Sequence, residues 1–172
     1  GEEPVLKHVS FAAQKGETIA FIGSTGSGKS TLINLIPRFY DVSEGQIRID
    51  GVDVKDYDVF ALRAKLGVIP QKAMLFSGTI KDNICFGKPD ASEEEILHAI
   101  KVAQAYDFIM EKEHGLKEEI SEGATNVSGG QKQRLSIARA LIRRPDIYIF
   151  DDSFSALDFK TDATLRKELK KE

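Results

Sequence analysis

The sequence predicts an α/β fold in which helices flank a parallel sheet, with a small antiparallel β portion near the N-terminus and an inserted helical subdomain. Short apolar, β-branched runs at 18–22, 68–69 and 147–150 have the character of buried strands. Helical patterns predominate from about residue 71 to residue 128, between the second and third of these runs. Strands that flank a helical block favour a parallel sheet with an insertion.

The first half of the chain alternates between strand and helix patterns. Strands are expected at 5–11, at 18–22 as a buried strand, at 45–49 before a turn, and at 68–69, where Pro70 ends the run. Helices are expected at 30–36, stopped by Pro37, and at 59–66. This order gives the expected division into one domain at 1–172, with a core formed by 1–70 and 146–172 and a helical subdomain at about 71–145.

Helix signals dominate the second half. Ser92 and Glu95 form a capping-box pattern ahead of an apolar face. Another helix is expected from Ser128 to Arg144, where Pro145 stops it, and a last helix begins near Phe159 and is still running at Glu172.

Bulk composition limits the function classes. The 172 residues suffice for one domain, and the net charge of −3 without a basic block argues against a nucleic-acid surface. The single cysteine, Cys85, excludes a disulfide framework. No apolar run approaches the roughly 20 residues that span a bilayer, and the first four residues do not resemble a signal peptide. A membrane role is therefore expected to need another segment or chain.

Residues 23–30 read G-x-x-x-x-G-K-S, the pattern of a phosphate-binding loop (P-loop). The expected strand before it and helix after it are the context this motif requires. Glycines let successive N–H groups point inward around an anion, Lys29 would reach the outer phosphates, and the Ser30 hydroxyl would hold Mg²⁺. A dinucleotide site fits poorly, because Thr31 stands where a third glycine is needed. The predicted phosphate-binding residues are Gly23, Ser24, Thr25, Gly26, Ser27, Gly28, Lys29, Ser30 and Thr31.

Two aspartates follow the apolar strand at 147–150. Carboxylates at this edge of a P-loop protein hold magnesium, so Asp151 is the expected metal ligand and Asp152 the residue that polarises the attacking water. The alternative is an acidic cap for the next helix, which the P-loop makes less favoured.

A second glycine-rich segment lies at 127–131. Ser128 and Gln131 alone form a capping box. Gly129 and Gly130, however, cost up to ~1 kcal/mol each in a helix, so a role in close backbone approach to an anion is favoured.

The ordered motifs resemble the nucleotide-binding domain of ABC transporters, whose core is a P-loop NTPase fold. The resemblance implies that the chain binds ATP and Mg²⁺, and that two such domains close head-to-tail around two nucleotides. Gln71 would sense the metal and the attacking water, and would join Ser30 and Asp151 as a magnesium ligand. The signature residues Ser128, Gly129, Gly130 and Gln131 would contact the nucleotide of the partner domain, and Ser155, Ala156, Leu157 and Asp158 would link the two sites.

The segments 36–41 and 71–84 are similar to those of multidrug and lipid-flippase exporters. In that type a transmembrane domain lies upstream on the same chain, and residues near Phe76 contact its coupling helices. The resemblance therefore implies a domain peripheral to the cytoplasmic face of the cell membrane. It also implies that the switch histidine and the adenine-stacking aromatic lie beyond the two ends, so the domain is expected to be truncated at both.

The family usually has glutamate where this chain has Asp152. Aspartate is shorter by roughly 1 Å, a misplacement that can cost ~10²-fold in rate. The resemblance therefore extends to the degenerate-site half of heterodimeric exporters, in which ATP drives dimerisation and the chain's own site hydrolyses slowly. A soluble ABC protein acting on DNA or ribosomes and a small P-loop kinase fit the motifs less well.

Overall fold

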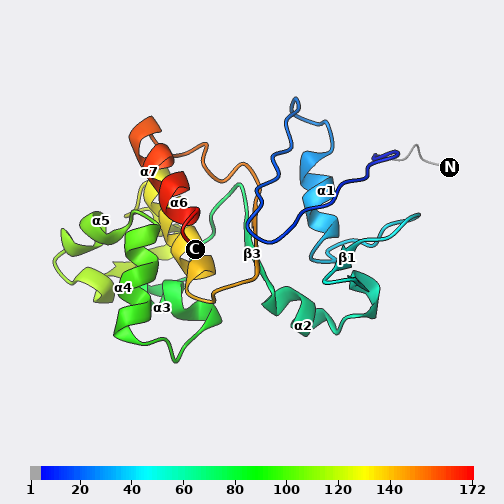
Figure 1. The fold of residues 1–172 in the computed structure, drawn as a ribbon. Helices are drawn as coiled ribbons and strands as arrows, with labels where there is room; N and C mark the ends of the chain where they lie inside the picture. Colours follow the sequence, from blue (N-terminus) through cyan, green and yellow to red (C-terminus); the bar gives the residue numbers. More distant parts are fainter. Residues whose placement is uncertain (1–4) are drawn as a thin grey trace. The chain divides into compact units, whose positions relative to one another are not determined.

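The computed structural model describes residues 5–172, which fall into two compact units, Gly1–Lys65 and Leu66–Glu172 (Figure 1). Residues 1–4, one basis of the expectation that there is no signal peptide, lie outside the described residues. Within the described part of the chain, no helix has the length and apolar character needed to cross a membrane.

The first unit holds two helices and a short hairpin. Helix α1 spans Lys29–Leu35, as the P-loop pattern predicted, and α2 spans Val59–Ala64. The strands β1 (Arg48–Ile49) and β2 (Val52–Asp53) pair antiparallel, which confirms the small antiparallel portion, and η1 (Val54–Asp56) follows. The tight reversal between these strands is made by Asp50 and Gly51, which both have positive φ.

Two predicted strands are not found. Segments 5–11 and 18–22 have no ladder partner in the structure, and Ile22 is 96% exposed. The two segments nevertheless pack together through Phe11 and Phe21, whose rings are in edge contact with centroids 5.0 Å apart. A β-branched run shows strand propensity, but a strand needs a hydrogen-bonded neighbour, and propensity does not supply one.

The second unit is built on a parallel strand pair. Strand β3 (Leu66–Ile69) lies beside β6 (Ile147–Phe150), with Leu66 opposite Ile147 and Ile69 opposite Phe150. The strands are separated by residues 70–146, which contain the helical block that the sequence predicted. A further antiparallel pair, β4 (Gly78–Thr79) with β5 (Glu119–Ile120), was not predicted.

Helices fill the rest of this unit. They are α3 (Ile80–Ile84), η2 (Cys85–Gly87), α4 (Glu93–Val102), α5 (Tyr106–Met110), η3 (Gly115–Lys117), η4 (Glu122–Ala124), α6 (Gly129–Leu141) and α7 (Phe159–Leu169). The capping boxes predicted at the starts of α4 and α6 are both present. Helix α7 ends at Leu169 and does not continue to Glu172 as predicted, because the terminal Lys-Lys-Glu offers no apolar side chain to pack against the core.

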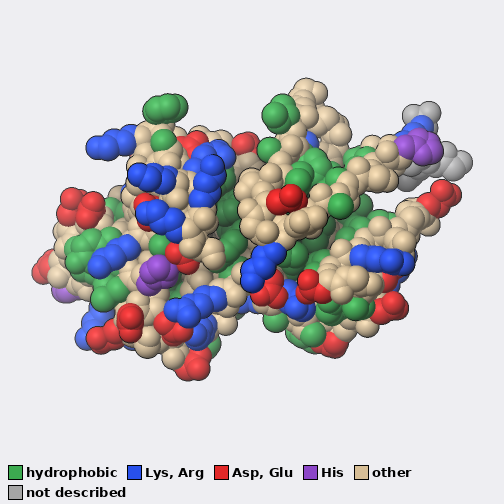
Figure 2. Space-filling view, viewed as in Figure 1, with side chains coloured by type: hydrophobic (Ala, Val, Ile, Leu, Met, Phe, Trp, Pro, Cys, Tyr) green, Lys and Arg blue, Asp and Glu red, His purple; other side chains and the backbone are tan. Residues whose placement is uncertain are grey.

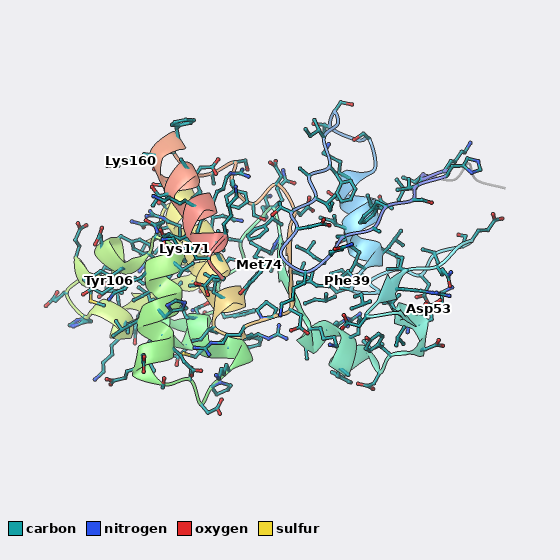
Figure 3. The ribbon with its side chains drawn as sticks, in the orientation of Figure 1. Phe39, Asp53, Met74, Tyr106, Lys160 and Lys171 are labelled. Atoms are coloured by element: carbon teal, nitrogen blue, oxygen red, sulfur yellow. The ribbon has the colours of Figure 1, made fainter. Side chains whose placement is uncertain are left out.

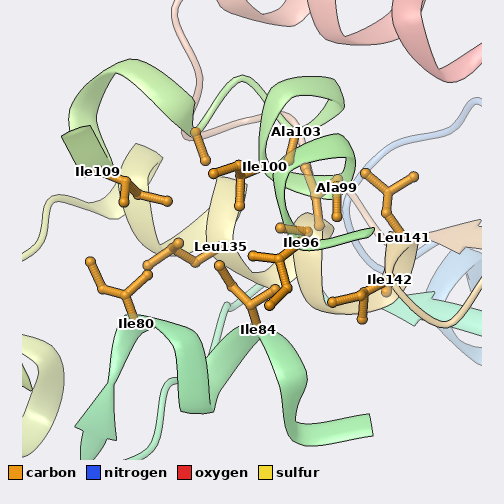
Figure 4. Close-up of a cluster of buried hydrophobic side chains, with 14 of the residues drawn as sticks. Ile80, Ile84, Ile96, Ala99, Ile100, Ala103, Ile109, Leu135, Leu141 and Ile142 are labelled. Carbon is orange, nitrogen blue, oxygen red and sulfur yellow. The ribbon is translucent and has the colours of Figure 1, made fainter. Parts of the chain in front are cut away.

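The main core lies between α3, α4, α5 and α6 (Figure 4). Isoleucines from three of these helices meet the leucines of α6: Ile80, Ile84, Ile96, Ile100 and Ile109 against Leu135 and Leu141. Cys85 belongs to the same cluster, and burial raises the pKa of its thiol. The second unit thus contains β6 and α7 as well as the helical block, and the grouping of 146–172 with 1–70 stays a prediction.

Candidate functional site

The P-loop curls around the side chain of Lys29. Its Nζ donates to the carbonyl oxygens of Gly23, at 2.6 Å, and Ser24, at 2.8 Å, and lies 3.3 Å from Ser27 Oγ. Gly26 and Gly28 have φ of +81° and +92°, a region that other residues rarely adopt. The ammonium is thus bonded to carbonyl oxygens of the loop itself, directly before α1.

Close packing explains two of the loop glycines. A Cβ on Gly23 would lie 2.6 Å from Ser27 Oγ, and one on Gly28 would lie 2.9 Å from Leu6 Cδ2. Gly28 is also the N-cap of α1, so Lys29 and Ser30 open the helix directly after the loop. A side chain at either position would displace Ser27 or Leu6, so the loop keeps this conformation only with glycine there.

A second group of predicted site residues lies where β3 and β6 end. Because Ile69 is opposite Phe150, the residues that follow the two strands are neighbours. The Asp151 N–H donates to Ile69 O at 3.0 Å, and Gln71 Nε2 donates to Asp152 Oδ2 at 3.2 Å. The structure therefore brings together two residues that the sequence assigned to catalysis from positions 81 residues apart.

The start of α6 contains the capping box that the sequence predicted, and it also contains the two glycines of the signature. The Ser128 N–H donates to Gln131 Oε1 at 3.0 Å and the Gln131 N–H donates to Ser128 Oγ at 3.2 Å, which completes the capping box. A Cβ on Gly130 would lie 3.0 Å from Ala156 O, so this glycine lets the helix approach its own neighbouring loop. A Cβ on Gly129 would meet nothing within 4 Å.

Gly129 therefore has no packing reason to be glycine. It is the first residue of α6 after the Ser128 N-cap, and its backbone is exposed.

The loop at 155–158 connects the aspartates to α7. Ser155 Oγ donates to Asp152 O at 3.1 Å, and Asp158 is the N-cap of α7. Hydrogen bonds from the side chain and the backbone N–H of Thr161 hold the pKa of the Asp158 carboxyl below its usual value. The loop is thus anchored at both ends, and between them Ala156 lies so near α6 that a Cβ on Gly130 would approach its carbonyl oxygen to 3.0 Å.

Three polar residues at this site were missed from the sequence. Gln133 is 2% exposed and donates to Pro70 O at 3.1 Å, next to Gln71. Ser153 is 1% exposed, and its hydroxyl donates to Ile69 O at 2.6 Å. Arg139 donates to the backbone carbonyls of Asn83 and Met74. Gln133 and Arg139 occupy the buried face of α6, and a polar residue on the apolar face of a helix is the signal that could have identified them.

A cavity of about 220 Å³ opens beside these residues. Met74 (labelled in Figure 3), Phe86 and Arg139 line it, and Phe76 stacks on Phe86 with ring centroids 4.8 Å apart. The Arg139 guanidinium lies 4.9 Å from the Phe76 ring centroid, and burial lowers its pKa. Met74, Phe76 and Phe86, all substantially exposed, are called the aromatic patch below.

Charge is mixed over the visible surface of each unit, where lysines and arginines are interspersed with acidic residues (Figure 2). This agrees with the small net charge of −3.

Comparisons with known proteins point to one family. The family model described as "ABC transporter" matches residues 6–155. Provisionally named multidrug export ATP-binding/permease proteins of Staphylococcus aureus, in strains NCTC 8325, COL and MW2, are 49% identical over 168 residues. These matches cover 98% of this chain and 29% of each relative, so the chain spans less than a third of their length.

A solved structure gives the same result for the fold. The structure of a bacterial Atm1-family ABC exporter with ATP bound superposes with a TM-score of 0.82 at 42% identity. The match covers 86% of this chain and 26% of that one. The P-loop NTPase fold expected from the sequence is confirmed by this likeness.

Proposed function

The chain belongs to the ABC transporter family, and we propose that it is the ATP-binding and ATP-hydrolysing motor domain of an exporter. The observation that carries the proposal is the P-loop, in which the Lys29 ammonium donates to the carbonyl oxygens of Gly23 and Ser24. A related structure that contains ATP supports the choice of nucleotide. Residues 23–31 would bind its phosphates.

Magnesium fits the oxygen donors that the chain offers. Ser30, Gln71 and Asp151 supply a hydroxyl, an amide oxygen and a carboxylate, which are the hard ligands this ion prefers. Gln71 donates from Nε2 to Asp152, so Oε1 is the atom that would face the metal. When bound, the ion neutralises charge on the phosphates.

Asp152 is the proposed general base. Its carboxylate accepts a hydrogen bond from Gln71, and both groups would contact the attacking water. Gln71 would orient that water while Asp152 draws a proton from it. Phosphoryl transfer needs little other covalent chemistry from the protein, so the placement of these two side chains sets the rate.

The signature is proposed to serve the nucleotide of a second domain. Gly129 is open to solvent at the start of α6 and has no packing role of its own. In a head-to-tail pair, the residues 128–131 would contact the partner's γ-phosphate, and the loop 155–158 would connect the two sites. The close approach of α6 to Ala156, which leaves no room for a Cβ on Gly130, supports a link between signature and loop.

The aromatic patch is the proposed contact with a transmembrane domain. Three large apolar side chains project beside a cavity, and the names of the relatives include a permease. Such a contact would place the domain at the cytoplasmic face of the membrane. Arg139 and the buried Asn83 fix the patch from behind, because Asn83 bonds both the N–H and the carbonyl of Phe76.

One observation favours a second version of this function. Asp152 is shorter than the glutamate usual in the family, so the chain would be an ATP-dependent dimerisation half whose own site hydrolyses slowly. Its partner in that case is a different ABC subunit, and the pair is a heterodimeric exporter. The two versions share nucleotide binding and differ in turnover.

Calorimetric titration of the full-length protein with MgATP tests the proposal. Lys29→Ala should weaken binding tenfold or more, since a charged hydrogen bond contributes about 1.5–3 kcal/mol. Lys15→Ala, in the exposed turn before the P-loop, is the matched control and should leave the affinity unchanged. Equal affinities for the parent and Lys29→Ala would contradict the nucleotide site.

A further inference from the structure

The carbonyl oxygen of Ile69 accepts two hydrogen bonds that straddle Asp152. One comes from the Asp151 N–H, at 3.0 Å, and the other from the Ser153 hydroxyl, at 2.6 Å. Ser153 is 1% exposed, so this hydroxyl is shielded from water. The residues before and after Asp152 are therefore tied to a single atom at the end of β3.

Asp152 itself has an uncommon backbone conformation. Its φ is +46°, in the left-handed region that residues with a Cβ adopt at a cost. Such a conformation persists only where the surroundings impose it. The two bonds to Ile69 O and the bond from Ser155 Oγ to Asp152 O are the constraints that do so here.

The backbone conformation determines where the carboxylate points. With φ positive, Asp152 Oδ2 lies 3.2 Å from Gln71 Nε2. Gln71 follows the same strand whose last carbonyl holds Ser153, so one strand end positions both members of the pair. A relaxed turn would rotate the Cα–Cβ bond of Asp152 and move its carboxylate away from the amide.

We propose that Ser153 is a positioning residue, which holds the Asp152 carboxylate against Gln71 through the bond from its hydroxyl to Ile69 O. This inference rests on the proposed function, because it assigns a supporting residue to the same catalytic pair. Ser153 does not touch the reacting atoms. It acts by keeping the turn at 151–155 in the one conformation that aims the base.

Kinetics of the full-length protein, with its partner where there is one, separate positioning from a general structural role. Asp152→Glu provides an active background. In it, Ser153→Ala should lower kcat about tenfold, since misplacing a catalytic group by 1 Å can cost ~10²-fold. The KM for MgATP should stay within about twofold, because no substrate contact is removed. Ser153→Thr keeps the hydroxyl and should retain most of the turnover.

Ser153→Ala in an Asp152→Asn background completes a double-mutant cycle, which tests whether the effect of Ser153 depends on the carboxylate. Without a carboxylate there is nothing to aim, so Ser153→Ala should cause no further loss of kcat. Two results would overturn the inference. One is an unchanged kcat in the Asp152→Glu background, and the other is an equal loss whether or not position 152 carries a carboxylate.

Hydrogen–deuterium exchange gives a readout that does not depend on turnover. Ser153→Ala should speed exchange in peptides that cover 150–155, whereas Ser136→Ala, which removes another buried hydroxyl from α6, should not. Exchange at 150–155 that is unchanged by Ser153→Ala contradicts the positioning role. Failure of the parent protein to bind MgATP would instead contradict the proposed function. The exchange result would still test whether Ser153 holds the turn at 151–155.

Discussion

At the scale of single residues, the length of one side chain separates the two versions of the proposed function. Asp152→Glu adds one methylene and advances the carboxylate by roughly 1 Å toward the attacking water. We expect kcat for ATP hydrolysis to rise ten- to a hundredfold, roughly the rate that such a displacement controls. The KM for MgATP should change little.

Steady-state ATPase assays of the full-length protein measure this change. Asp162→Glu lengthens a partly exposed carboxylate on α7 that pairs with Arg166, and it serves as the control that should leave kcat unaltered. Rapid turnover by the parent, with no gain from Asp152→Glu, would show that the shorter residue is already competent.

A second residue-scale prediction concerns alkaline pH. Burial, and next the negative charge of Glu172, raise the pKa of Tyr148 to about 12 from a usual value of 10.0. Between these values the unfolded chain has lost the phenol proton and the folded chain still holds it, so stability falls as pH rises from about 10 to about 12. Tyr148→Phe should flatten this fall, and Tyr106→Phe, at a more exposed phenol, is the control. Denaturant unfolding at a series of alkaline pH values measures it.

At the scale of elements, local signals predicted some structures and missed others for identifiable reasons. Ser128 with Gln131 placed the start of α6, because a capping box acts within one turn of helix. The predicted end at Arg144 was wrong: α6 ends at Leu141, and Arg144 has a positive φ. Segment 18–22 was wrongly predicted as a strand, since pairing depends on a distant neighbour. The β4–β5 pair was missed for the converse reason, because two-residue strands leave no periodicity to detect.

The same contrast applies to the candidate site. The family resemblance indicated Gln71 and the aspartates after the strand at 147–150 indicated Asp152, and the structure places the two side chains in hydrogen-bond contact. Ser153 gave no signal, because its role comes from a carbonyl 84 residues away in the sequence. A motif identifies the groups that touch a substrate, whereas the groups that hold them in place are defined by tertiary contacts.

The N-terminus of α6 carries the element-scale prediction. Gly129→Asp should leave this chain's own MgATP affinity nearly intact and abolish ATP-driven pairing with the partner domain. A carboxylate there would lie where the partner's γ-phosphate is expected, and like charges 4 Å apart repel by about 4 kcal/mol at an effective dielectric of 20. The new side chain meets open space, and an acidic residue suits a helix N-terminus, so the fold should not suffer.

Light scattering under non-hydrolysing conditions measures pairing, alongside titration of the variant with MgATP. Gly129→Ala adds the same Cβ without charge and should weaken pairing less than Gly129→Asp does, so the difference between the two variants reports the effect of the charge. This control is better at 129 than at 130, where any Cβ would approach Ala156 O to 3.0 Å. Loss of the chain's own ATP binding, with pairing intact, would mean that the signature acts within its own chain.

At the scale of the whole molecule, the two halves of the proposed machinery serve different nucleotides. The P-loop with Lys29 and the pair Gln71–Asp152 would act on the nucleotide that this chain binds. The signature with Gly129 would act on the nucleotide of the partner. Substitutions in the two places therefore report on two different sites of one assembly.

This division predicts an asymmetry in the complete transporter. If Asp152 makes this chain's own site slow, most turnover comes from the site that its signature completes. Gly129→Asp should then abolish nearly all ATPase activity of the assembled pair, while Lys29→Ala should leave most of it. ATPase assays on reconstituted transporter, with each variant in this chain alone, measure the ratio. A homodimer carries every substitution at both of its sites, so Gly129→Asp and Lys29→Ala would reduce its ATPase activity equally. An equal reduction would exclude the heterodimeric version.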